Sequence, residues 1–224
     1  MSKPRIKLSL VGMGAIANRH IDAINHFSDE FELIDICDSN EEVLNYQSKK
    51  LDVNGFSQLD ELISQTSSDF IILCTPNGLH YEQSIQCVQG GFNVITEKPM
   101  CLSYKEALSM NEAFKKLKKK LFVVKQVRLL KRIRFIKEAI EKGYLGDIYI
   151  SNFNLFWSRP QEFYDEANWR GTKSMDGGTL FNQAIHYIDL MLWLLGPVQK
   201  VSCFSSTLAR NIEVEDTAVL NFEF

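Results

Sequence analysis

Apolar runs and stretches of helical periodicity alternate along the first half of the chain. Strands are expected at 6–11, 31–37, around Phe56, at 69–74, 92–96 and 121–124. After the first strand, helices are expected through Ile21, Ile24 and Phe27, and at 41–50, 59–65, 80–88 and 103–118. Near-continuous apolar strands that alternate with helices are typical of a parallel sheet covered on both faces. The pattern therefore predicts an α/β fold, a doubly wound parallel sheet over residues 1–122.

The second half has a different pattern and predicts a separate α+β domain over residues 123–224. A helix is expected at 131–142, a strand at 147–157, a long loop with aromatic residues at 158–176 and a helix at 179–195. Two further strands, at 198–208 and 218–224, predict a mainly antiparallel sheet. The alternation stops at Phe224 without a closing element, so we expect this sheet to be incomplete and the chain truncated.

Composition and charge narrow the class of protein. The 224 residues are 45% hydrophobic and 24% charged, as in ordinary soluble globular proteins. The net charge of −3 gives no general attraction to nucleic acid, and the lysines at 115–120 are expected at a helix end. No run could span a membrane, and Met1–Arg5 lead into a strand without a signal peptide. Five cysteines without metal-binding spacing predict reduced thiols in a cytoplasmic protein with no metal site.

The turn after the first strand has the spacing Gly12-x-Gly14-x-x-Ala17. Gly12 permits a tight turn, Gly14 lets the backbone approach a pyrophosphate, and Ala17 lets the next helix pack close to the strand. Ala15 and Ile16 lie between them, at a helix N-terminus that would face the phosphates. A strand, this turn and a helix in sequence predict a dinucleotide-binding site.

Asp38 ends the second expected strand, 21 residues beyond Ala17. A carboxylate at this position accepts hydrogen bonds from the ribose hydroxyls and repels a 2′-phosphate. Because no arginine follows closely in 39–42, the sequence favours NAD over NADP. The alternative is that Asp38 serves only as a turn or helix-cap residue.

Short motifs follow two further strands of the expected sheet. Their candidate cofactor-binding residues are Thr75, Pro76, Asn77, His80, Glu97 and Lys98. Ligands of such sheets bind beyond the carboxyl ends of the strands, so we expect these residues to face the cofactor. The alternatives are a strand-ending turn for 75–77, a packing role for His80, and a surface position for Lys98.

The expected helix 179–195 carries three polar residues on one face. Asn182, His186 and Asp189 fall at i, i+4 and i+7 of a helix that is otherwise strongly apolar. This arrangement indicates a functional face. The alternative is a buried histidine that is satisfied by its neighbours.

Together, and in this order, these motifs resemble those of the Gfo/Idh/MocA family. The resemblance implies an N-terminal Rossmann domain that binds NAD, and a C-terminal domain that binds a small-molecule substrate and often forms a homo-oligomer through its sheet. It implies that Lys98 is the active-site lysine and His186 the acid/base residue. The family commonly has aspartate at the position of Asn182. Asparagine can orient the histidine but supplies no charge, which leaves Lys98 a larger share of proton transfer.

Residues 156–172 and 176–183 are similar to a narrower branch, the dehydrogenases that oxidise the 3-hydroxyl of UDP-N-acetylglucosaminuronic acid for surface polysaccharides. The resemblance implies substrate contacts from Arg159, Tyr164, Trp169, Arg170, Asn182 and His186. Arginine suits a diphosphate or a carboxylate, because guanidinium pairs bidentately with both. Alternatively, the two arginines hold the loop by salt bridges. Two other functions stay open: an NAD-dependent dehydrogenase of a free sugar or cyclitol, and a non-catalytic nucleotide-binding regulator.

Overall fold

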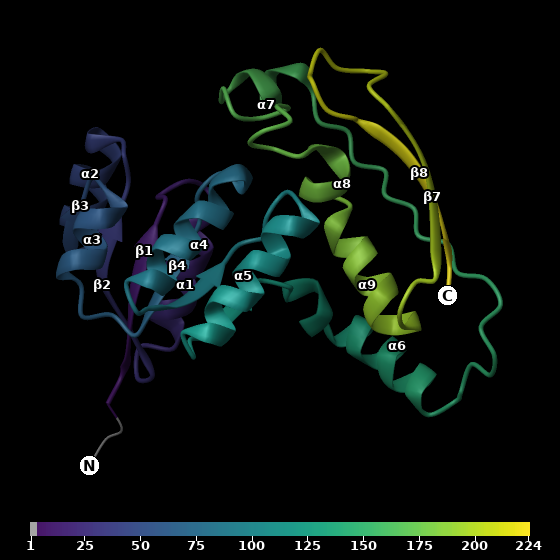
Figure 1. Ribbon diagram of the computed structural model, residues 1–224, viewed down its shortest axis with the longest axis horizontal. Helices are drawn as coiled ribbons and strands as arrows, with labels where there is room; N and C mark the ends of the chain where they lie inside the picture. The colour runs from purple at the N-terminus through teal and green to yellow at the C-terminus, as the bar shows by residue number, and fades with distance from the viewer. Residues whose placement is uncertain (1–3) are drawn as a thin grey trace. The chain divides into compact units, whose positions relative to one another are not determined.

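The computed structural model describes residues 4–224 and divides into two compact units (Figure 1). The first unit ends at Val124 and the second runs from Lys125 to Phe224. The expectation of no signal peptide rests on Met1–Arg5, of which Met1–Lys3 lie outside the described residues. Among the described residues, no helix combines the length and hydrophobicity needed to cross a bilayer.

A six-stranded parallel sheet forms the centre of the first unit (Figure 1). Its strands are β1 (Ile6–Val11), β2 (Phe31–Cys37), β3 (Asn54–Phe56), β4 (Phe70–Leu73), β5 (Asn93–Thr96) and β6 (Leu121–Val123). The spatial order β3-β2-β1-β4-β5-β6 reverses direction between β1 and β4. The predicted doubly wound sheet is therefore confirmed, and its ligand-binding edge is expected where β1 and β4 end.

Helices cover both faces of this sheet. They are α1 (Ala17–His26), α2 (Glu41–Leu51), α3 (Leu59–Gln65), α4 (His80–Gln89) and α5 (Tyr104–Lys116), with a 3₁₀ turn η1 (Asn77–Leu79) before α4. Ile72 of β4 packs with Ile21 of α1 and Leu44 of α2. Its neighbour Ile71 packs in a second cluster with Leu62 of α3, and that cluster includes α4 and α5. Because successive strand residues face opposite sides, β4 anchors both layers.

The second unit combines helices with a small antiparallel sheet. Its elements are η2 (Gln126–Leu129), α6 (Lys131–Glu141), α7 (Gln161–Asp165), α8 (Gly178–Asn182), α9 (Ile185–Leu195), β7 (Lys200–Ser206) and β8 (Thr217–Glu223). Strands β7 and β8 pair antiparallel along their whole length. The expected antiparallel pairing of the last two strands is thus confirmed.

Two expectations for 147–176 were wrong. Residues 148–157 form no strand, although their apolar and polar residues alternate. A segment with alternating residues forms a strand only where a neighbouring strand accepts and donates its backbone hydrogen bonds. Among the described residues, no strand pairs with this segment. The expected loop at 158–176 contains the short helix α7, which follows Pro160 as a helix start often does.

The helix expected at 179–195 is also interrupted. The N–H of Ala184 donates to the carbonyl oxygen of Thr179, five residues earlier and 2.8 Å away, instead of four. This wide turn separates α8 from α9. The expected single helix is therefore two helices joined at this turn, and Gln183 and Tyr187 on its two sides still line the same cavity.

All five cysteines are unbonded thiols. Those in the first unit, Cys37, Cys74, Cys87 and Cys101, are buried, whereas Cys203 on β7 is exposed. Burial raises the pKa of the Cys37 thiol to about 11 and that of Cys87 to about 12. These thiols act as small apolar side chains of the core.

Candidate active site

The turn between β1 and α1 brings Gly12 against the end of β4. Gly12 has φ +87°, and a Cβ there would lie 2.9 Å from the backbone carbon of Cys74 and the nitrogen of Thr75. At Gly14, by contrast, a Cβ would enter open space. Ile16 provides no side-chain cap for α1. The turn thus leaves room beside an uncapped helix N-terminus, an arrangement that fits the phosphates of a dinucleotide.

Asp38 lies beyond β2 and holds this turn. Its Oδ2 accepts the N–H of Met13 at 2.7 Å, and its Oδ1 accepts the N–H of Asn40 at 2.8 Å. A carboxylate oxygen has more than one acceptor position, so Asp38 can still accept hydrogen bonds from a ribose. Asp38 is therefore a turn residue, as the alternative proposed, and it also lies at the edge of the sheet where the sequence predicts a nucleotide.

His80 joins the loops that follow β4 and β5. Its ring is 0% exposed, with Nδ1 2.7 Å from the carbonyl oxygen of Pro99 and Nε2 2.9 Å from that of Thr75. Burial lowers the pKa of His80, although the two carbonyl oxygens and Glu97 oppose this shift. The ring has no exposed surface to offer a cofactor. The geometry fits the packing role, in which His80 positions the loops.

Glu97 anchors the motif that follows β5. Its Oε1 lies 2.9 Å from Nε2 of His20 on α1, and its Oε2 accepts the N–H of Lys98 at 3.2 Å. Burial raises the pKa of Glu97, but the hydrogen bonds from His20 and Lys98 outweigh this effect and lower it. The peptide bond between Lys98 and Pro99 is cis. Glu97 thus fixes the backbone that carries the predicted catalytic lysine.

The carboxyl edge of the sheet therefore collects the residues predicted to bind the cofactor. Thr75 donates its hydroxyl to Gln83, while Asn77 is buried in η1. The residues at this edge are Gly12, Gly14, Ala15, Ile16, Asp38, Thr75, Pro76, Asn77, Glu97 and Lys98. They come from loops after β1, β2, β4 and β5, whose carboxyl ends share one edge because the strands are parallel.

Asp176 organises part of the second unit, and sequence reasoning did not select it as a site residue. It is buried, its Oδ2 accepts the N–H of Gly171 at 2.7 Å, and its Oδ1 accepts a hydrogen bond from the Asn182 side chain. A carboxylate therefore contacts position 182, although residue 182 itself supplies no charge. In the sequence, Asp176 stands before two glycines, and nothing in that pattern indicates that its carboxylate binds Asn182.

His186 and Asp189 lie together on α9, whereas Asn182 ends α8. The wide turn lies between Asn182 and His186, so the two residues belong to different helices. The carboxylate of Asp189 accepts hydrogen bonds from Nε and Nη2 of Arg128 at 2.7 and 2.6 Å, with Lys125 Nζ at 3.7 Å. Asp189 therefore joins α9 to the segment that contains η2.

The two predicted substrate arginines have different surroundings. Arg170 donates from Nη1 to the carbonyl oxygen of Phe163 and to Glu166, both at 2.6 Å, so the salt-bridge alternative describes it. The guanidinium of Arg159 lies over the rings of Trp157 and Phe163, 4.4 Å from each centroid. Among residues 4–224, no carboxylate lies within 4 Å of Arg159.

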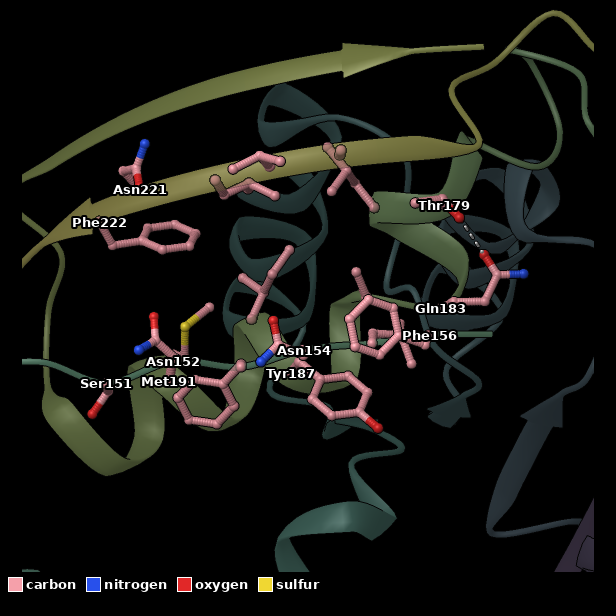
Figure 2. Close-up of a pocket in the computed structure, with 18 of the residues that line it drawn as sticks. Ser151, Asn152, Asn154, Phe156, Thr179, Gln183, Tyr187, Met191, Asn221 and Phe222 are labelled. Atoms are coloured by element: carbon pink, nitrogen blue, oxygen red, sulfur yellow. Dashed lines mark hydrogen bonds between the residues drawn. The ribbon is translucent and has the colours of Figure 1, made fainter. Parts of the chain in front are cut away.

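A cavity of about 1480 Å³ lies within the second unit. Figure 2 shows Asn221 and Phe222 along β8, with Asn152 and Asn154 on the segment opposite and Tyr187 from α9. Of the predicted substrate residues, Arg159 and Tyr164 line this cavity. Trp169, Arg170, Asn182 and His186 are not among its lining residues.

Comparison with known proteins identifies the family. Residues 6–125 match the oxidoreductase family with an NAD-binding Rossmann fold, and residues 133–224 match the GFO/IDH/MocA C-terminal domain. The chain belongs to the GFO/IDH/MocA family. The predicted family and its cofactor, NAD, are confirmed, and the glycine turn with Asp38 fits that cofactor.

Two solved structures resemble the chain over nearly all of its length. The WlbA dehydrogenase from Chromobacterium violaceum, in complex with NADH and UDP-GlcNAcA, is 46% identical with a TM-score of 0.97 over 100% of this chain and 65% of that chain. The WlbA dehydrogenase from Bordetella pertussis, with the same ligands, is 43% identical with a TM-score of 0.96 over 98% and 68%. The predicted resemblance to the sugar-nucleotide branch is thus confirmed.

A curated relative acts on a different compound. The scyllo-inositol 2-dehydrogenase (NADP(+)) of Bacillus subtilis is 28% identical over 98% of this chain and 60% of its own length. The chain spans about half to three fifths of the length of the first curated relatives that it matches.

Proposed function

We propose that this protein is an NAD-dependent dehydrogenase that oxidises a secondary alcohol of a sugar nucleotide. The proposed substrate is UDP-N-acetylglucosaminuronic acid, oxidised at its 3-hydroxyl on a route to surface polysaccharides. The observation that carries this proposal is the 46% identity, at a TM-score of 0.97, to a dehydrogenase that binds NADH and UDP-GlcNAcA. The carboxylate of Asp38 beside the glycine turn supports NAD as the cofactor.

We assign the proton-accepting role to Lys98. Bound NAD supplies the hydride acceptor for the substrate carbon. Lys98 takes the hydroxyl proton as the C–H bond breaks and the carbonyl forms. Glu97, held by His20, fixes the Lys98 backbone, and a fixed position keeps the amine within reach of the proton it removes. His186 and Asn182 are proposed to hydrogen-bond the substrate, with Asp176 orienting the Asn182 amide.

A free cyclitol or sugar is the second candidate substrate. The observation that favours it is the 28% identity to the scyllo-inositol dehydrogenase across almost the whole chain. The test mixes the protein and NAD with UDP-N-acetylglucosaminuronic acid, inositol or glucose, follows NADH absorbance, and identifies the product by mass spectrometry. A keto nucleotide sugar supports the first proposal. Turnover of inositol or glucose alone replaces it with the second.

Substitution of Lys98 tests the assigned role. We expect Lys98→Ala to lower kcat by about 100-fold to 10,000-fold, because a positioned proton acceptor contributes that much. The Kd for NAD, measured by calorimetry, stays near the wild-type value. Lys105→Ala, which removes an exposed lysine of α5, serves as the matched control and keeps full activity. Loss of NAD binding in Lys98→Ala would instead make Lys98 a cofactor-binding residue.

We also propose a homo-oligomer that uses the sheet of the second unit. Phe204 on β7 and Val219 on β8 are cross-strand neighbours, and they are 75% and 60% exposed. We take this exposed pair as the candidate contact surface, because contiguous exposed apolar side chains mark sites of protein–protein contact. Light scattering at two protein concentrations measures the assembly, and a monomer at both would exclude this proposal.

A further inference from the structure

His20 is a titratable residue of the first unit that is not among the predicted site residues. It lies in the first turn of α1, and Ala17 and Ile21 of the same helix are buried. Both of these side chains belong to the hydrophobic core beside the sheet, so α1 gives His20 a rigid support. The imidazole faces the loop after β5, where its partner lies 77 residues further along the chain.

The partner of His20 is the carboxylate of Glu97. Nε2 of the ring lies 2.9 Å from Oε1, and the two side chains are 17% and 8% exposed. Because an ionised carboxylate only accepts hydrogen bonds, His20 donates this one from Nε2. Strand β4 lies between β1 and β5 in the sheet, so the contact draws the carboxylate across the end of β4 toward α1.

The same carboxylate also acts on Lys98. Burial raises the pKa of Glu97, whereas His20, the Lys98 N–H and the Lys98 charge lower it. Attraction between opposite charges is mutual, so a carboxylate beside a lysine favours the ammonium form of that lysine. A lysine that accepts a proton must first be a neutral amine. Glu97 therefore holds the Lys98 backbone in place but opposes the form of the side chain that reacts.

The other titratable groups beside Glu97 do not resolve this conflict. His80 of α4 and Cys74 at the end of β4 both interact electrostatically with Glu97. Burial lowers the pKa of His80 and raises that of Cys74, so both side chains are uncharged near neutral pH. Within residues 4–224, the side-chain hydrogen bond to Glu97 comes from His20.

We infer that His20 is a positioning residue for the oxidation, which turns the Glu97 carboxylate toward α1 and limits its hold on the Lys98 amine. This role rests on the proposed function, in which Lys98 accepts the hydroxyl proton. His20 acts through Glu97 and takes no proton from the substrate itself. Without His20, the carboxylate keeps its charge but loses a donor, and the Lys98 ammonium can replace that donor. Lys98 then releases its proton only at a higher pH.

The pH dependence of turnover tests this role. We expect His20→Leu, which removes the donor, to lower kcat near neutral pH by about tenfold and to move the rise of kcat with pH upward by about one unit. His20→Gln keeps a neutral N–H donor and should restore most of both. KM and the Kd for NAD stay near their wild-type values. His26→Leu, which changes an exposed histidine in the last turn of α1, is the matched control and keeps the wild-type profile.

A second measurement needs no substrate. Competitive acetylation at a series of pH values, followed by mass spectrometry of peptides, gives the pH at which the Lys98 amine becomes reactive. Lys105, an exposed lysine of α5, is the reference in the same sample. We expect the Lys98 transition to lie about one pH unit higher in His20→Leu, with Lys105 unchanged. Melting temperatures show whether the variants are folded, and His20→Asn, whose amide is too short to reach Glu97, replaces His20→Leu if that variant is not.

The two measurements separate this role from the proposed function. An unchanged Lys98 transition in a folded His20→Leu overturns the role, and so does an equal loss of kcat at every pH that His20→Gln does not restore. If His20→Leu oxidises UDP-N-acetylglucosaminuronic acid with the wild-type kcat and pH dependence, the proposed function stands and the role of His20 fails. If the Lys98 transition moves but the wild type oxidises none of the sugars, the link from His20 to Lys98 stands and the proposed function fails.

Discussion

Gly12 and Gly14 are two residues apart in one turn, yet the structure gives them different tasks. Gly12 combines φ +87° with close backbone neighbours at Cys74 and Thr75, and backbone atoms cannot move aside as a flexible side chain can. Gly14 has neither constraint, because a Cβ there meets nothing within 4 Å. The first glycine is required by the fold, and the second leaves space for a ligand.

Alanine substitutions separate these two tasks. We expect Gly12→Ala to destabilise the protein by more than about 1 kcal/mol, since it adds both backbone strain and a steric conflict. Gly14→Ala should unfold at the same denaturant concentration as the wild type but bind NAD more weakly, because its methyl group enters the space beside the phosphates. Chemical denaturation and calorimetry measure the two effects. A destabilised Gly14→Ala with normal NAD affinity would contradict this division.

Glu97 predicts how stability depends on pH. Its pKa in the folded protein lies below its ordinary value of 4.5, so folding favours the ionised carboxylate. The stabilisation is present above that ordinary value and is lost as the pH falls through the lower folded value. We expect the free energy of unfolding to fall more steeply below pH 4.5 in the wild type than in Glu97→Gln. Urea titrations across this range measure the difference.

The control for Glu97 is Glu112→Gln, which neutralises an exposed carboxylate of α5. It should retain the wild-type pH dependence, because an exposed carboxylate has nearly the same environment in the folded and unfolded chain. Parallel pH profiles for the wild type and Glu97→Gln would show that Glu97 gains nothing from His20. Above pH 5, Glu97→Gln should be less stable by about 1.5–3 kcal/mol, the range for hydrogen bonds to charged groups.

The sequence predicted residues whose role depends on local backbone, and missed those whose role depends on distant partners. Gly12, Asp38 and Lys98 could be found because strand ends and their spacing place them at one edge of the sheet. Arg159 and Arg170 looked alike, because their different surroundings appear only when the chain folds. Asp216 gave no sign that its carboxylate accepts backbone N–H groups of the turn that precedes it.

At the scale of elements, α2 depends on Asn40 for its start. The Asn40 Oδ1 accepts the N–H groups of Glu42 and Val43 at 3.0 and 3.1 Å, and the Asn40 N–H contacts Asp38. We expect Asn40→Ala to lower the free energy of unfolding by about 1 kcal/mol, the usual cost of losing an N-cap. Asn40→Asp keeps an acceptor and should stay close to the wild type. Equal stability of all three proteins in chemical denaturation would show that the cap contributes nothing.

Elements with a strong local pattern were predicted well, and those that need a distant partner were not. The bounds of α3, Leu59–Gln65, match the expectation at both ends. Its helical hydrophobic period and the polar residues that flank it indicate the same start and end. The segment 147–157 alternates as a strand does, but strand formation also needs a neighbour. The break between α8 and α9 depends on the bond from Ala184 to Thr179, which no hydrophobic pattern reveals.

At the scale of the whole molecule, the two units differ in how their backbone hydrogen bonds are satisfied. Strand β4 is hydrogen-bonded to β1 on one side and to β5 on the other, and it lies between the two layers of helices. Residues 148–157 have no strand pairing among the described residues. Local stability follows these bonds and contacts, so the two segments should open with very different free energies.

Hydrogen exchange tests this difference. We expect the amides of β4 to exchange at least about 100-fold more slowly than those of 148–157, because exchange from β4 requires global or near-global unfolding. Mass spectrometry of peptic peptides measures both segments in one experiment. Equal protection of the two would show that 148–157 pairs with a strand in solution.

The unequal exposure of the thiols makes the protein convenient to label. Maleimides react with the thiolate, and burial keeps the other four cysteines protonated and out of reach. A dye added under native conditions should therefore attach at Cys203 alone, without any change to the sequence. Cys203 pairs with Leu220 across the β7–β8 hairpin. The fluorescence of a dye attached there would report on that hairpin, in a preparation with a single fluorophore.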